Sequence, residues 1–416
     1  MKPRGKRLRA ITEAPPPART LPGDLVLEIA AWADAATLVR FAASCKPLRR
    51  DILNPDFVRR FRVTPTACLL GFLHAYDHMV LAIRPSALFS LIQPTTPAAA
   101  SLSGTRIVPR LSRGALDDFL GRYVPLSSRH GLLVLRRRHI KRRGSRDICV
   151  FDPFTGDRSF FSPPDIKRDF SYTYTLLTAA DGVGSSFLLV AADFMNLGRS
   201  CSIKIQTVSS ANSDREWGPV AVSNHPLQKM SYLSPWGGVV VLGSLIHWLM
   251  YATDKGSLIL TYNVGTTTAG SIELPADVLP EGQILLNHHL TSSSDGRLIL
   301  LAADGYTVSI WHLLSTGDGW EQQASIDISP LVPDLTQRWQ ELHRRIKFVG
   351  GTGGRSGAVL LRPSTIDYRL LNGENRIFLL DMETKEMRRI SNQDYTGSSF
   401  PYEVDLASRL SVMKIF

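Results

Sequence analysis

Pairs of short apolar runs recur along residues 131–385, and their spacing restricts the fold of this chain more than any other feature. Five β-rich runs, each ending in a polar turn, begin near residues 148, 203, 259, 308 and 377, so the repeat is 49 to 69 residues. Many of them follow another apolar run, as GLLVL (131–135) precedes DICVF (147–151). A hairpin-like unit repeated at this period is typical of a β-propeller with four-stranded blades.

The number of repeats predicts a propeller of about six degenerate blades over residues 62–416. Five units are legible, and the stretch 63–130 has room for a sixth. The period is closest to that of kelch-like repeats, and no Gly-His and Trp-Asp pair recurs as it does in WD40 repeats. A pair of β-sandwiches is the alternative fold.

Residues 21–61 have a different, helical pattern. Leu21, Leu25, Ile29 and Trp32 follow one another at steps of four, four and three, which places them on one face of a helix. Pro22 stands where a helix begins, since its missing N–H would be unbonded there. The chain is therefore expected to be an α+β multidomain protein, with this helical segment before an all-β domain.

Two further helices are expected in the same segment. Asp34 can cap AATLVRFAASC (35–45), and Pro47 opens a third helix in which Leu48 and Ile52 point inward. Three helices of about ten residues form a core too small to be stable alone. Either another protein surface completes this packing, or the helices are a structural cap on the propeller with Leu21, Leu25 and Ile29 as ordinary core.

The helical segment resembles an F-box, the module of roughly forty residues that binds the Skp-type adaptor of cullin–RING ubiquitin ligases. The sequence differs from the family pattern at Leu48, where the family often has Trp, and at Ala33-Asp34, where the family often has Leu-Pro. The domain after it resembles the degenerate propeller-like domains of many plant F-box proteins, most clearly at SLIHWLMY (244–251), which implies a plant origin. The matching positions are Leu21, Pro22, Asp24, Leu25, Glu28, Ile29, Leu38, Val39, Cys45, Lys46, Arg49, Ile52, Pro55 and Phe57.

This resemblance implies a substrate-recognition subunit of a Skp–cullin–F-box ubiquitin ligase. Such a subunit bridges the adaptor, and through it a cullin, to a target protein whose identity the sequence does not give. Catalysis belongs to other subunits, and no cofactor is needed. The alternative is a stand-alone β-propeller, a scaffold or a hydrolase, with an N-terminal helical cap. The residues that the resemblance assigns to adaptor binding are Leu21, Pro22, Leu25, Ile29, Leu38, Val39, Cys45, Leu48 and Ile52.

The net charge of +11 is concentrated in two tracts. Residues 1–20, which we expect to be a disordered tail, hold six basic residues and one acidic residue, and RRRHIKRR (136–143) holds six basic residues. The remainder is neutral, so a nucleic-acid partner is not favoured. The tail is either an import signal or simply solvated, and we expect a nuclear or cytoplasmic location, or both. RRRHIKRR is either a solvated hairpin loop or a docking patch for an acidic or phosphorylated partner.

Motifs for catalysis, metal binding and membrane insertion are absent from the sequence. GGTGGRSG (350–357) lacks the ending of a phosphate-binding loop, and no HExxH or GxSxG occurs. The four cysteines are far apart, so we expect neither disulfides nor a zinc site. His288 and His289 should point to opposite sides of a strand, and His247 should be a core residue. The longest apolar stretch, 237–251, is broken by Gly243 and predicts two strands around a turn rather than a membrane span.

Overall fold

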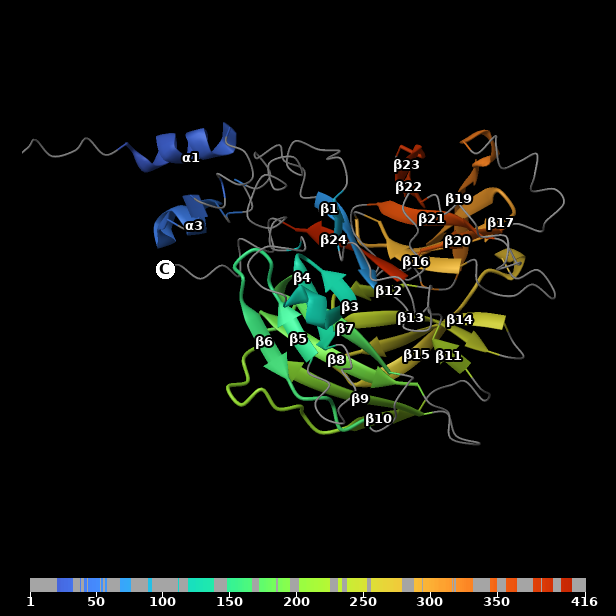
Figure 1. The fold of residues 1–416 in the computed structure, drawn as a ribbon, viewed down its shortest axis with the longest axis horizontal. Coiled ribbons are helices and arrows are strands. Elements are labelled where there is room, and N and C mark those ends of the chain that lie inside the picture. The colour runs from blue at the N-terminus through green and yellow to red at the C-terminus, as the bar shows by residue number, and fades with distance from the viewer. Residues whose placement is uncertain are drawn as a thin grey trace, which may run out of the picture.

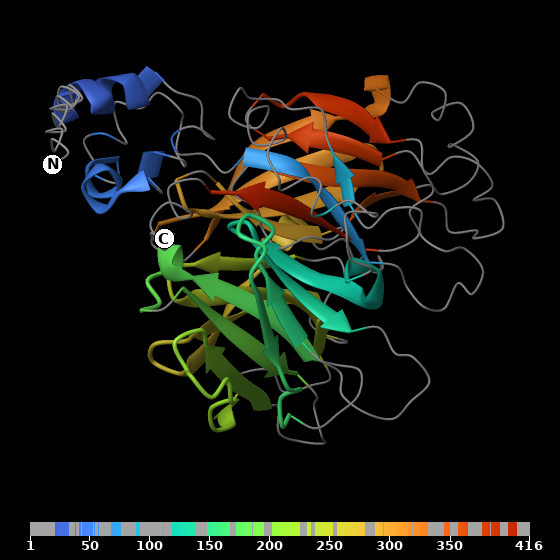
Figure 2. The same cartoon turned by 60° about the vertical axis from the view of Figure 1, so that its left-hand side comes forward.

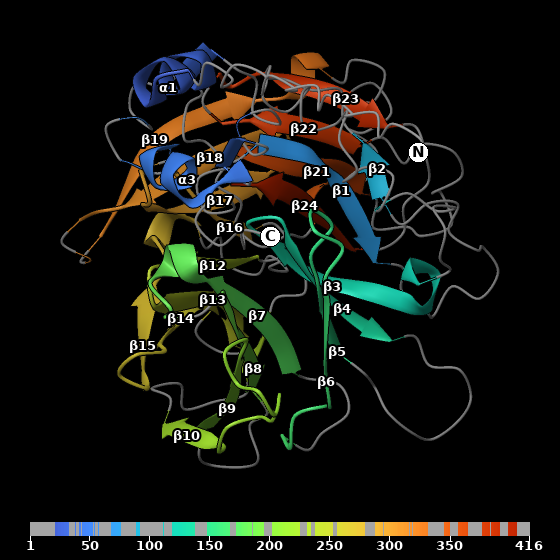
Figure 3. The same ribbon diagram turned by 90° about the vertical axis from the view of Figure 1, so that its left-hand side faces the viewer.

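A computed structural model of the 416-residue chain shows a mostly β protein with helices at its N-terminal side (Figure 1). Figures 2 and 3 show the same fold from two further directions. The structure describes residues 21–32, 38, 41–42, 44–52, 54, 57, 68–75, 89–91, 111, 119–137, 148–166, 172–184, 186–194, 202–224, 231–233, 238–252, 256–278, 288–293, 295–315, 317, 319–331, 345–349, 357–364, 377–382, 384–391 and 398–405.

Five antiparallel sheets are blades of a β-propeller, each made of consecutive strands. The first three contain β3 (Tyr123–Arg129), β4 (Leu132–Arg137), β5 (Ile148–Phe151) and β6 (Arg158–Phe161); β7 (Tyr172–Thr178), β8 (Phe187–Asp193), β9 (Ser202–Ser209) and β10 (Ala221–Asn224); and β11 (Ser231–Leu233), β12 (Val239–Leu242), β13 (Leu245–Ala252), β14 (Gly256–Asn263) and β15 (Thr268–Glu273). The other two contain β16 (His288–Ser292), β17 (Leu298–Asp304), β18 (Thr307–Leu313) and β19 (Trp320–Asp327); and β20 (Arg345–Phe348), β21 (Ala358–Ser364), β22 (Ile377–Asp381) and β23 (Met387–Ser391).

A sixth, three-stranded sheet joins the two ends of the β domain. β1 (Cys68–Ala75) pairs antiparallel with β2 (Phe89–Leu91) on one side and with β24 (Ser398–Val404) on the other. β24 in turn lies beside β3, so this sheet connects to the first blade. Figure 3 shows the sheets around a common centre. The sequence predicted about six blades, and the described strands form five complete blades and this shorter closing sheet.

The apolar core follows the same ring. Six clusters of buried side chains fill the six contacts between neighbouring sheets. The series starts and ends at the closing sheet, so the ring is complete. Successive residues of one strand belong to different clusters: Leu300 faces β11–β15, whereas Leu301 faces β20–β23. The middle strands are therefore buried on both faces, which explains why their sequences are continuous apolar runs. Outermost strands such as β19, with sequence WEQQASID, alternate between exposed and partly buried residues.

Short 3₁₀ helices and tight turns connect the strands. η1 (Leu120–Arg122) enters the first blade, η2 (Ala179–Asp181) follows β7, and η3 (Ala276–Val278) and η4 (Ser329–Leu331) follow β15 and β19. Gly243 has a φ of 58° in the turn between β12 and β13, a conformation that favours glycine. The apolar stretch 237–251 thus contains two strands, as predicted. No described helix is long and apolar enough to cross a membrane.

The N-terminal segment contains the helices α1 (Gly23–Trp32) and α3 (Lys46–Ile52). Pro22 directly precedes α1, and its carbonyl oxygen accepts hydrogen bonds from the backbone N–H groups of Leu25 and Val26, both at 3.1 Å. Between the two helices, residues 38, 41, 42 and 44 are also helical. The second of the three predicted helices is therefore seen only at these positions, and the three-helix unit is not confirmed. The tail 1–20 lies outside the described residues.

A buried ion pair connects three consecutive blades. Arg129, at the end of β3, makes two contacts with Asp181 of η2, one of them a 3.0 Å hydrogen bond from Nε to Oδ2. The same guanidinium donates to the backbone oxygen of Val241 in β12, at 2.9 Å. Burial by itself would raise the pKa of Asp181, but hydrogen bonding and the charge of Arg129 outweigh it and hold that pKa below its ordinary value.

Replacing Asp181 by Asn should therefore destabilise the propeller by about 3 kcal/mol, because it leaves the Arg129 charge buried without its carboxylate. Since the folded-state pKa of Asp181 is lowered, the stabilisation is fully present above the pKa of the unfolded carboxyl, about 4. The stabilisation is lost as the pH falls through the pKa of Asp181 in the folded protein. The difference in free energy of unfolding between the parent protein and the Asp181→Asn variant should therefore shrink in acid. Denaturant unfolding at neutral and acidic pH measures both effects.

Asp295→Asn is the matched control, because Asp295 pairs with Arg297 at an exposed turn. That change should alter the free energy of unfolding by no more than about 0.5 kcal/mol. Equal effects of the two substitutions would show that the Arg129–Asp181 pair does not hold the blades together.

Candidate functional site

The outward face of α1 exposes three large apolar side chains. Leu21, Leu25 and Ile29 are 60%, 45% and 50% exposed. The spacing of four residues places Leu25 and Ile29 on one side of α1, and Leu21 lies two residues before the helix begins. Pro22 is also exposed. Single exposed apolar residues are ordinary on protein surfaces, but a row of them on one face is typical of a binding surface. We call Leu21, Pro22, Leu25 and Ile29 the apolar row.

The opposite side of α1 packs into a core of its own. Ala30 is fully buried together with Leu38, Ala42 and Ile52, and Leu27, Phe41, Leu48 and Phe57 pack against them. These helices therefore hold one another through small and medium apolar residues while the apolar row faces outward. The alternative in which Leu21, Leu25 and Ile29 are core residues of a structural cap disagrees with their exposure.

The nine positions assigned to adaptor binding fall into different environments. The four residues of the apolar row are accessible, and Cys45 is an exposed free thiol. Leu38 and Ile52 lie inside the helical core, and Leu48 is partly buried against it. These three hold the helices in place rather than offer surface. Val39 lies outside the described residues.

One side chain connects the helical core to the propeller. Phe154, in the turn between β5 and β6, packs against the helical cluster and also against the cluster between the closing sheet and the first blade. Asp152 shapes this turn, since its Oδ1 accepts a hydrogen bond from the Phe154 backbone N–H at 2.8 Å. The helices are thus in contact with the β3–β6 blade. In Figures 1 and 2 they lie together on one side of the sheets.

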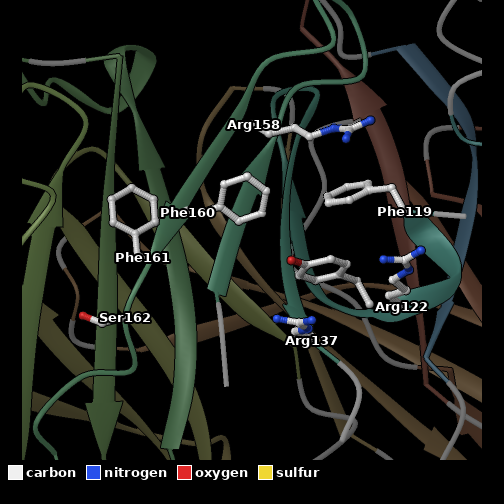
Figure 4. Close-up of a pocket in the computed structure, with 8 residues that line it drawn as sticks. Phe119, Arg122, Arg137, Arg158, Phe160, Phe161 and Ser162 are labelled. Atoms are coloured by element: carbon white, nitrogen blue, oxygen red, sulfur yellow. The ribbon is translucent and has the colours of Figure 1, made fainter. Parts of the chain in front are cut away.

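A second feature is an open pocket of about 610 Å³ on the same blade. Three arginines and aromatic rings line it, and Arg158 lies above the ring of Phe119 in Figure 4. We call it the arginine pocket, and its lining residues are Phe119, Arg122, Tyr123, Arg137, Arg158, Phe160, Phe161 and Ser162.

Strand register explains why these residues meet. Tyr123 of β3 pairs with Arg137 of β4, and alternation along β4 places Arg137 on the same face as Leu135. Cys149 pairs with Leu135 on one side and with Phe160 of β6 on the other, so that face continues across the blade. The pocket is therefore built from η1 and the residue before it, the first and last strands of the blade, and the end of β4.

Aromatic contacts position the charged groups. The Arg158 guanidinium carbon lies 4.0 Å from the centre of the Phe119 ring, a cation–π contact. Phe119 lies 4.6 Å from Tyr123 and 6.3 Å from Phe160, measured between ring centres. Phe160 is 42% exposed at the open side of the pocket. The arrangement can bind an anionic group against an apolar wall.

Buried titratable groups elsewhere are part of the core. Burial lowers the pKa of His74 and of His247 to about 4, so both are neutral at neutral pH, and His247 lies 3.3 Å from the backbone oxygen of Val240. His288 contacts the backbone of Val278 while His289 stacks on Phe348, on opposite sides of β16 as predicted. Within the described ranges no three His, Cys, Asp or Glu residues are placed to bind a metal ion.

Cys149 is buried and pairs with Phe160 of the pocket wall. Burial raises the pKa of its thiol to about 12, and the nearby charge of Arg158 offsets only part of that shift. The thiol is therefore protonated at neutral pH and packs as a small apolar side chain.

Sequence reasoning found the apolar row and missed the pocket. Of the lining residues, only Arg137 belongs to a segment that the sequence marked, the basic tract 136–143. Arg136 and Arg137 end β4, and the rest of that tract lies outside the described residues. Phe119, Arg122, Tyr123 and Arg158 carry no motif in the sequence. The first three are close in sequence at the entry to β3, and the pairing of the strands brings Arg137 and Arg158 onto the same blade.

Comparison with known families places residues 92–416 in the family described as a domain of unknown function, DUF7595. The match spans more than half of the chain, so the chain belongs to this family. It begins just after β2 and does not include the helical segment. No curated protein matches the chain.

Among solved structures, the chain is similar to a periplasmic gluconolactonase of Pseudomonas aeruginosa, at 13% identity and a TM-score of 0.39, covering 80% of this chain and 84% of that one. It is also similar to a chain of a nidogen/laminin complex, at 9% identity and a TM-score of 0.36, covering 81% and 98%. A putative TolB of Agrobacterium tumefaciens gives 14% identity and a TM-score of 0.34, covering 68% and 89%. Similarities of this size carry no conclusion about function.

Because the apolar row is exposed and the helical core is buried, the same Ile→Ala change should affect stability differently at the two places. Ile52→Ala, at a site that is 1% exposed, should cost about 2–5 kcal/mol and unfold the small helical unit. Ile29→Ala, at a site that is 50% exposed, should leave it folded. Amide hydrogen exchange in α1 and α3 measures both. Equal loss of protection in the two variants would place Ile29 inside the core.

Proposed function

We propose that this protein is the substrate-recognition subunit of a Skp–cullin–F-box ubiquitin ligase. The observation that carries the proposal is the apolar row, which lies at the positions where the sequence resembles the adaptor-binding residues of an F-box. A helix that packs one side into its own core and leaves Leu25 and Ile29 outside, next to the exposed Leu21, is suited to docking on another protein.

In this proposal the two parts of the chain have separate tasks. The apolar row binds a Skp-type adaptor and through it a cullin, and the propeller holds the target protein. Propellers suit the second task because their loops vary on a rigid scaffold. The contact of Phe154 with the helical core supports a fixed orientation between the two tasks.

The chain itself is then non-catalytic and uses no cofactor. It would accelerate ubiquitin transfer by holding the target near the enzyme that carries ubiquitin, an effect of proximity alone. The protein would act in the nucleus, the cytoplasm or both. Kelch-like repeats and a plant origin are also proposals, and they rest on the resemblance in the sequence.

The test is co-precipitation of the full chain with a Skp-type adaptor. A Leu21→Ala/Pro22→Ala/Leu25→Ala variant should lose the adaptor, because truncating a central apolar anchor costs on the order of 2 kcal/mol. The matched control is Val222→Ala/Leu314→Ala, which removes side chains that are 61% and 42% exposed on the propeller. The control should bind normally, and full binding by the triple variant would refute the proposal.

A further inference from the structure

We propose that the arginine pocket binds a phosphorylated segment of the target protein. This inference names the class of target for the proposed receptor and rests on that function. Two observations carry it: the charge of the pocket walls, and the way in which aromatic contacts and strand register hold the charged groups.

The lining of the pocket is strongly basic. It contains Arg122, Arg137 and Arg158, and none of its eight residues is acidic. All three arginines are exposed to solvent. An arginine cluster of this kind is the common means of recognising phosphorylated peptides, because guanidinium groups donate pairs of hydrogen bonds to phosphate oxygens.

The Arg158 charge and the backbone of Arg137 are positioned before a ligand arrives. Stacking on Phe119 restricts Arg158, and pairing of β3 with β4 fixes the backbone of Arg137 opposite Tyr123. A side chain that is already oriented loses less entropy on binding. Figure 4 shows Arg122 and Arg137 on one side of the Phe119 ring and Arg158 on the other.

The pocket favours a phosphoryl group within a peptide over a carboxylate. A phosphoryl group carries about −1.5 to −2 charges and three acceptor oxygens, whereas one arginine can satisfy both oxygens of a carboxylate. The exposed ring of Phe160 offers apolar surface to neighbouring peptide residues. The volume of about 610 Å³ accommodates a phosphorylated side chain with part of the adjoining backbone.

The location suits a substrate receptor. Arg158 begins β6, four residues after Phe154, the side chain that contacts the helical core. A target segment in the pocket would thus be held on the same blade that contacts the adaptor-binding helices.

The experiment measures retention of short degenerate peptide libraries on the immobilised full chain. The central residue of each library is phosphoserine, phosphotyrosine, serine or glutamate. We expect one phosphorylated library to be retained at least about tenfold more than the serine library, the effect of charge-assisted hydrogen bonds. Equal retention of all libraries overturns the inference. Retention of the glutamate library equal to that of the phosphorylated library also overturns it, because it would indicate an acidic segment without phosphate.

The variants identify the pocket as the source of binding. Arg137→Gln/Arg158→Gln should lose the preference for phosphorylated peptides, and Arg122→Gln, on the 3₁₀ helix outside the sheet, should weaken it at least severalfold. The matched control is Arg389→Gln, an exposed arginine on the outer strand β23 of another blade, which should change nothing. Equal weakening by the control would mean that the chain binds phosphate through general positive charge, and would overturn the assignment to this pocket.

The phosphopeptide experiment can fail or succeed independently of the adaptor experiment. The Leu21→Ala/Pro22→Ala/Leu25→Ala variant should keep its preference for phosphorylated peptides, because the apolar row does not line the pocket. Loss of peptide binding in that variant would contradict the independence of the two sites. If the adaptor test fails while phosphopeptide binding persists in the parent chain, only the ubiquitin-ligase assignment falls.

Discussion

The antiparallel pairing of β1 with β24 is the constraint on which the rest of this structure depends. It joins residues 68–75 to residues 398–404 and so closes a ring in which each sheet covers the faces of its neighbours. Middle strands buried on both sides are stable only while both neighbours are present. The Arg129–Asp181 pair adds a polar connection across three consecutive blades.

Ring closure also determines where the helical segment can go. β1 lies at the start of the ring, so the helices before it emerge at the closing sheet, and Phe154 of the adjacent blade packs against their core. This contact uses the inner side of the helices and leaves the apolar row exposed. The arginine pocket lies on the same blade, and the two candidate sites are therefore separate surfaces of the chain.

Much of the fold could be predicted from the sequence, because burial on both faces produces long apolar runs such as LILL at 298–301. The stretch 63–130 was expected to have room for a sixth unit, and it contains β1 and β2. The pairing of β1 with β24 could not be predicted, since these two strands lie more than 300 residues apart in the sequence. The spacing of Leu21, Leu25 and Ile29 identified the apolar row. The arginine pocket could not be predicted because the segment around η1 meets Arg137 and Arg158 only through strand register and a cation–π contact.

The central claim is that the outer face of α1 is a docking surface for another protein. Hydrogen–deuterium exchange of the full chain with and without a Skp-type adaptor tests it most directly, since exchange is followed at every peptide of both parts. We predict that the adaptor slows exchange in α1 and α3 and leaves the blades unchanged. Unchanged exchange in α1 together with protection of the propeller strands would contradict the claim.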